Sequence, residues 1–145
     1  MKPNMRAVAG APIAVLAAAS VLSGCTSAAN EAAQAAYDEC VRPESDVQVL
    51  FINEDTVSVQ VKGDLARAMA ESDFSAESIV NDSGELPESV GISLAVLAGT
   101  DCLVEQTGYP GSSDQLTDGE EWDNWRFSEE SGPGSEFSLL FTSTQ

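Results

Sequence analysis

VQVLFINEDTVSVQV, residues 47–61, is the most regular pattern in the chain and sets its fold class. Apolar residues alternate with other residues on both sides of the segment NED, whose residue types favour a turn. The pattern therefore predicts a β-hairpin. Leu50 and Ile52 add a second apolar face to the first strand, which indicates a strand covered on both sides. The second strand alternates cleanly and is expected to turn Ser58 and Gln60 outward.

A second hairpin is predicted at the C-terminal end of the chain. Two tryptophans and a phenylalanine occur within residues 122–127, and a glycine–proline turn follows at residues 132–134. Residues 137–142 then alternate between Phe137, Leu139 and Phe141 and the residues between them. This alternation is typical of a strand that returns beside the first one.

Two helices are predicted, one before each hairpin. The first covers about 28–41, where apolar residues recur at positions i, i+3, i+4 and i+7, and Pro43 ends it. The second covers 87–106, with a proline at its start and Gly108 just beyond its end. Gly99 weakens this helix by about 1 kcal/mol relative to alanine, and favours either close packing or a break.

The order helix, hairpin, helix, hairpin predicts an α+β fold. We expect two helices on one face of a small, four-stranded, mostly antiparallel sheet. Between the two halves, Asp64 is a candidate cap for a short helix in which Arg67 pairs with Glu71. Residues 73–84 are expected to be irregular.

The N-terminal segment predicts export and lipidation. Lys2 and Arg6 precede an apolar stretch over 8–22, which is shorter than the roughly 20 residues that span a bilayer. The residues just before Cys25 fit the recognition site of a signal peptidase: Leu22, Ser23 and Gly24. Together with Cys25 they resemble the lipobox of bacterial lipoproteins. The resemblance implies lipid attachment at Cys25 and a place on the extracytoplasmic face of the cell membrane.

This processing divides the chain into three parts. Residues 1–24 are the signal peptide that is removed, and residues 25–30 are the lipidated N-terminus and a short tether. Residues 31–145 are expected to form one extracytoplasmic domain. Attachment through two or more acyl chains holds a protein stably at a membrane.

The two remaining cysteines predict a disulfide. Once Cys25 is assigned to lipid, Cys40 and Cys102 are left as a pair in an exported and therefore oxidising setting. A bridge between them closes a loop of roughly 60 residues, which the chain-entropy treatment values at about 4 kcal/mol. The alternative is two free thiols or a redox pair, although catalytic dithiols usually lie two residues apart.

The mature chain is strongly acidic. Without residues 1–24 it keeps 121 of 145 residues, with four basic residues against 24 acidic ones and a net charge of −20. Such a charge repels nucleic acid and anionic headgroups and favours cationic partners. A nucleic-acid partner is therefore excluded, whereas a basic envelope protein or a cation is compatible with the charge.

The chain also resembles small lipoproteins of high-GC Gram-positive bacteria. Its matching residues are Tyr37, Asp38 and Cys40, then Cys102, Leu103 and Glu105, and finally Asp118, Gly119, Trp122, Asp123, Asn124 and Trp125. The chain departs from that pattern at Glu129, where those proteins often carry a second aromatic residue. That family has no assigned chemistry, so the resemblance implies location and fold and leaves the activity open.

Few residues point to catalysis or to a bound cofactor. The chain has no histidine, which excludes histidine-based triads and histidine-ligated zinc. Weak candidates for a calcium site are Asp114, Asp118, Glu120, Glu121 and Asp123. Leu116 and Trp125 stand where an EF-hand needs ligands, so no metal and no cofactor is expected.

These observations favour a non-enzymatic, membrane-anchored binding or structural module of the cell envelope. One alternative is a carboxylate-dependent enzyme acting on cell-wall glycan, in which the acids at residues 120–123 flank a sugar stacked on Trp122 and Trp125. Another is an inhibitor or solute-binding module that presents an acidic surface to a basic partner. The oligomeric state is left open.

Overall fold

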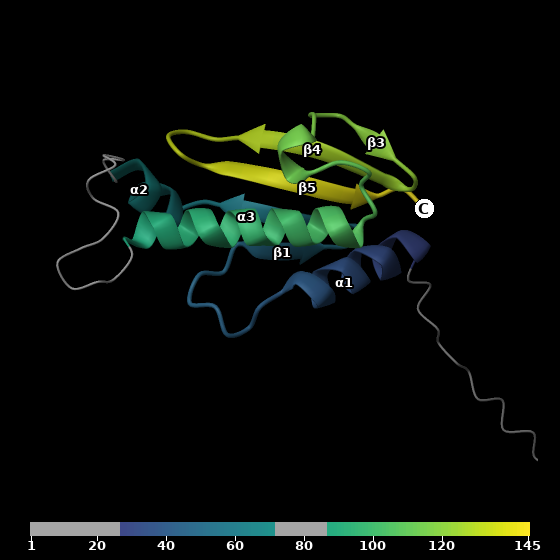
Figure 1. Ribbon diagram of the computed structural model, residues 1–145, viewed down its shortest axis with the longest axis horizontal. Coiled ribbons are helices and arrows are strands. Elements are labelled where there is room, and N and C mark those ends of the chain that lie inside the picture. Colours follow the sequence, from purple (N-terminus) through teal and green to yellow (C-terminus); the bar gives the residue numbers. More distant parts are fainter. Residues whose placement is uncertain (1–26, 72–86) are drawn as a thin grey trace, which may run out of the picture.

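The computed structural model describes residues 27–71 and 87–145 of the chain (Figure 1). The predicted signal segment, Cys25 and the region expected to be irregular at 73–84 lie outside the described residues. The fold is α+β, as predicted, with helices on one side of an antiparallel sheet.

The described residues form nine elements of secondary structure. The helices are α1 (Ala28–Cys40), α2 (Asp64–Glu71), α3 (Glu88–Gln106) and the short 3-10 helix η1 (Ser113–Gln115). The strands are β1 (Leu50–Asn53), β2 (Thr56–Val61), β3 (Glu121–Trp122), β4 (Trp125–Ser131) and β5 (Phe137–Ser143). The strands form one sheet in the order β1-β2-β5-β4-β3, and every neighbouring pair is antiparallel.

The predicted counts of two helices and four strands are wrong. The described residues contain three α-helices and a five-stranded sheet, because α2 and β3 join the expected elements. α2 is stabilised by burial of Ala66 in a cluster with Val61 and Ile92. Arg67 lies 2.7 Å from a carboxylate oxygen of Asp64 and 4.0 Å from one of Glu71, so the expected ion pair with Glu71 is present.

β2 and β5 join the two predicted hairpins at the centre of the sheet. Val57 lies opposite Phe141, and Val59 lies opposite Leu139. These side chains face α1 and α3, which cover the sheet from one side (Figure 1). The core between the two layers includes Val57, Val59 and Phe141, each with no exposed surface.

β1 differs from its prediction in length and in burial. It starts at Leu50 instead of Val47, although the carbonyl of Val49 still accepts a hydrogen bond of 2.7 Å from the Gln60 amide. Leu50 is buried beneath α3, whereas Phe51 is 42% exposed. The expectation of a strand covered on both sides is therefore wrong, because no described helix lies on the side of Phe51.

α3 begins and ends where the sequence predicts. Pro87 is its N-terminal cap, and Gly108 follows its C-terminal cap with a φ of +70°. The Tyr109 amide donates to the Val104 carbonyl and the Gly108 amide to the Glu105 carbonyl, which is a Schellman stop. The helix continues through Gly99, which leaves room for Leu50 to pack against it.

Candidate functional site

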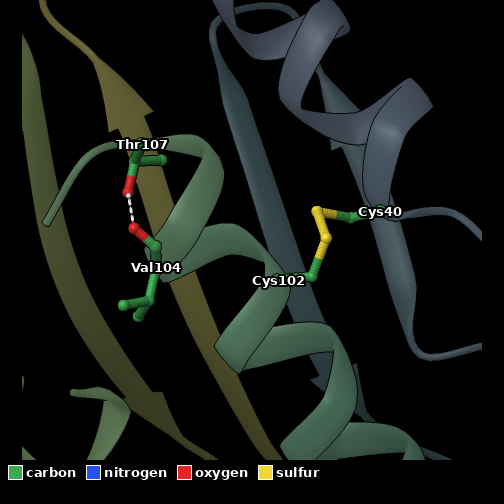
Figure 2. Close-up of a disulfide and its surroundings, with 4 residues drawn as sticks. All are labelled: Cys40, Cys102, Val104 and Thr107. Atoms are coloured by element: carbon green, nitrogen blue, oxygen red, sulfur yellow. Dashed lines mark hydrogen bonds between the residues drawn. A yellow bond between two sulfur atoms is a disulfide. The ribbon is translucent and has the colours of Figure 1, made fainter.

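A disulfide joins Cys40 and Cys102, as predicted (Figure 2). Cys40 is the last residue of α1 and Cys102 lies near the C-terminal end of α3, and their Cα atoms are 5.7 Å apart. The bridge links positions 62 residues apart. One turn further along α3, the Thr107 hydroxyl donates to the Val104 carbonyl at 3.3 Å (Figure 2). The bridge is thus a structural staple between the two helices that cover the sheet.

Tyr109 and Glu120 form the most developed polar contact among the acidic residues near the C-terminus. The Tyr109 hydroxyl lies 3.1 Å from each carboxylate oxygen of Glu120, and the Thr117 amide donates to the same carboxylate at 3.0 Å. Desolvation raises the pKa of Tyr109 above its usual value of 10.0, and the hydrogen bond to Glu120 and the charges of Glu120 and Asp114 raise it further. These contacts fix the loop that leads into β3.

The other weak metal candidates point to separate partners. Asp118 accepts a hydrogen bond of 2.9 Å from the Glu129 amide, and Glu121 pairs with Arg126 across β3 and β4. Asp123 lies in the turn between those strands with a φ of +43°. Within residues 27–71 and 87–145, no three acidic or cysteine side chains are grouped so that they could hold a metal ion.

The two tryptophans belong to the core. Trp122 is 9% exposed and Trp125 is 7% exposed. The Trp122 indole donates to the Thr107 carbonyl at 3.0 Å, and its ring centroid lies 4.8 Å from that of Tyr109. Neither ring offers a free face on which a sugar could stack, so these residues and the nearby acids do not form the platform that a glycan enzyme would use.

The side of the sheet away from α1 and α3 is the candidate site, and we call it the open face. Its residues alternate along the strands with those that contact the helices. Figure 1 shows α1 and α3 on the opposite side, and no described helix packs on this one. The central side chains of the open face are uncharged: Phe51, Thr56, Ser58, Ser128, Leu140 and Thr142. Toward β3 the same face carries the ion pair of Arg126 with Glu121.

Several hydrogen bonds order the open face. The hydroxyls of Thr56 and Thr142 are 3.0 Å apart across β2 and β5, and Gln60 donates to Ser58 at 2.7 Å. The sequence predicts the outward direction of Ser58 and Gln60, and the register places both on the open face. Ser58 is only 4% exposed, so its expected contact with solvent is wrong. The predicted alternation over residues 137–142 also sets Leu140 apart from Phe137, Leu139 and Phe141, and the register places Leu140 on the open face.

The open face ends in charged residues at both ends of its strands. Glu54 and Asp55 lie in the turn between β1 and β2, and the Asp55 carbonyl accepts from the Ser143 amide at 2.8 Å. At the other end is a recess of about 260 Å³, whose charged lining residues are Lys62, Glu130 and Glu136. Ser138 also lines the recess, and its buried hydroxyl has no hydrogen-bond partner among the described residues.

None of the helices in the described parts of the chain has the length and apolar character needed to cross a membrane. Comparison of the chain with family models, with curated proteins and with solved structures gives no match.

Proposed function

We propose that the protein is a lipoprotein anchored through Cys25 on the extracytoplasmic face of the cell membrane, where it acts as a non-enzymatic binding module. The basic and apolar segments before Cys25, with Leu22, Ser23 and Gly24, support the anchor. One structural observation carries the binding role. A strongly acidic domain leaves one side of its sheet without a covering helix among the described residues, and the row of side chains at the centre of that side is uncharged.

When one side of an antiparallel sheet is not covered by other elements, it usually faces water and carries polar residues. Here Phe51 is exposed on that side and Leu140 is partly exposed, while acidic residues occupy the turns around them. The centre of a protein interface is depleted in charge and enriched in aromatic residues, with a polar rim around it. The open face has this composition, which supports binding over a purely structural role.

The anchor would hold the domain close to the membrane. α1 starts at Ala28, three residues after Cys25. Three residues extend at most about 10 Å, so the domain stays near the lipid surface even with an extended tether. A partner would therefore be another component of the envelope, reached at short range.

The experiment compares the full chain with Cys25→Ala in the cells that produce it. We expect the unaltered protein in the membrane fraction and the variant in the soluble or unprocessed fraction. Chemical cross-linking of intact cells, followed by mass spectrometry, would then recover a defined envelope partner with the unaltered protein and much less of it with Cys25→Ala. Membrane attachment of a Cys25→Ala chain that has lost residues 1–24 would refute the anchor, and cross-linking to no component would refute the binding role.

A further inference from the structure

The centre of the open face is one uncharged row that crosses four strands. Phe51 of β1, Ser58 of β2, Leu140 of β5 and Ser128 of β4 are successive neighbours in the register. Phe51 and Leu140 supply apolar surface, and the side chains of Ser58 and Ser128 between and beside them are small. This row is therefore open to contact with another protein surface.

The open face is smaller than an ordinary protein interface, so a partner that covers it also contacts the residues around its edges. Four strands about 4.8 Å apart and about six residues long span roughly 20 by 20 Å, or about 400 Å². A stable protein interface covers about 800 Å² on each partner. An interface of ordinary size therefore extends past the uncharged row and onto the turns at both ends of the strands.

Those turns are acidic. Glu54 and Asp55 lie at one end, together with Asp123 in the turn between β3 and β4. At the other end, Glu130 and Glu136 outnumber the single lysine of the recess. A partner that covers the open face is expected to place cations opposite these acids, because like charges across an interface repel one another. The one arginine that the described residues place on this face, Arg126, is already paired with Glu121.

The recess gives a second and independent reason to expect a cation. Ser138 is 1% exposed, and its hydroxyl has no partner in the described structure. Buried hydroxyls are normally hydrogen-bonded, so a polar group that enters the recess would satisfy this one. An ammonium or guanidinium group in the recess would donate to Ser138 and to the carboxylates of Glu130 and Glu136, while Lys62 leaves the recess with a net charge of −1.

We propose that the open face binds a protein whose contact surface has an uncharged centre and a rim of lysine and arginine, with one of these side chains in the recess between Glu130 and Glu136. This proposal rests on the binding role proposed above and names its surface and partner chemistry. A second copy of this chain would bring its own acidic turns against these ones. A neutral glycan would make no use of the acidic rim.

The test places a photoreactive p-benzoylphenylalanine at Phe51 in the full lipidated protein, in the cells that produce it. Its matched control has the same group at Leu97, which is 54% exposed on α3 and lies on the opposite side of the sheet. Illumination is expected to join the Phe51 position, and not the Leu97 position, to one protein. The cross-linked region of that protein is expected to be rich in lysine and arginine.

Two further comparisons test the centre and the rim. Leu140→Glu is expected to lower the adduct yield about tenfold, the effect of losing a central contact, whereas Leu94→Glu on α3 leaves the yield unchanged. Ser128→Glu, in the same row as Leu140, replaces the first variant if that one does not fold. Raising the salt from about 0.1 M to about 1 M shortens the Debye length from about 10 Å to about 3 Å and is expected to reduce the yield.

The outcomes separate this proposal from the more general binding role. An adduct at Leu97 and none at Phe51 would keep the binding role and refute the open face. No protein adduct at either position, from a protein correctly anchored, would refute both. The proposed partner would be wrong if the adduct at Phe51 contained a second copy of the chain, glycan alone, or a protein whose contact region is not basic. It would also be wrong if neither high salt nor Leu140→Glu changed the adduct yield.

Discussion

Phe51 and Leu140 lie in one row across the open face, on either side of Ser58. Phe51 is the more exposed of the two, and it points away from the layer that contains Leu50. The same hairpin thus supplies a core residue and a surface aromatic one position apart. This relationship separates the residues that hold the fold together from those available to a partner.

Replacing Phe51 by alanine is expected to change the free energy of unfolding by less than about 1 kcal/mol, because its side chain is 42% exposed. The matched control is Phe127→Ala, in which a side chain that is 1% exposed is lost from the core. That change is expected to cost about 3–5 kcal/mol. Urea unfolding measures both values. Equal costs would show that Phe51 is buried in the folded protein.

Removal of the disulfide by Cys40→Ala together with Cys102→Ala is expected to lower the free energy of unfolding by about 4 kcal/mol, because the unfolded chain regains the freedom of a loop of about 60 residues. Chemical unfolding with and without reductant provides the measurement. The reductant should destabilise the unaltered protein and have no effect on the double variant. A reductant effect in the double variant would contradict the assignment of this bridge.

Gly99 within α3 and Gly108 just beyond its C-terminal cap are expected to respond to alanine with opposite signs. At Gly99, an added Cβ would lie 3.5 Å from Leu50 and 3.7 Å from Val59, which are ordinary van der Waals contacts. Because alanine has the higher helix propensity, Gly99→Ala is expected to raise the free energy of unfolding by up to about 1 kcal/mol. At Gly108, φ is +70°, so Gly108→Ala is strained and destabilises by about 1 kcal/mol. Thermal unfolding of both variants gives the signs. Destabilisation by Gly99→Ala would show that Leu50 packs more tightly than the structure indicates.

The pKa of Tyr109 is expected to lie above 10.0 in the folded protein and to fall toward that value in Glu120→Gln, which removes the nearby negative charge. Because the folded pKa exceeds the unfolded one, the stabilising contribution is fully present below pH 10.0 and is lost as the pH rises through the folded pKa. Absorbance of the tyrosinate form measures the titration. Tyr37→Phe provides the background, since the chain has only two tyrosines. An unchanged titration in Glu120→Gln would refute the contact.

Local signals in the sequence predict the helices and turns well. Pro87 and Gly108 bound α3 because a cap and a stop act on the residues beside them. α2 is only eight residues long, and its place depends on Ile92 and Val61, which come from other elements. A helix of that length has little stability of its own, so sequence patterns indicate it weakly.

The centre of the sheet and the site depend on contacts between distant residues. Thr56 and Thr142 are 86 positions apart, and no local pattern indicates that β2 lies beside β5. The pairing of Cys40 with Cys102 was predictable because the expected lipidation of Cys25 leaves only these two cysteines. The contact of Tyr109 with Glu120 was not, because it depends on where the loop after α3 returns to the sheet.

Mass spectrometry of the N-terminus of the protein purified from membranes of the producing cells tests the proposed anchor most directly. The proposal predicts a mature chain that begins at Cys25 and carries a diacylglyceryl group on that residue. A chain that retains residues 1–24, or one that begins at Cys25 without lipid, would contradict it.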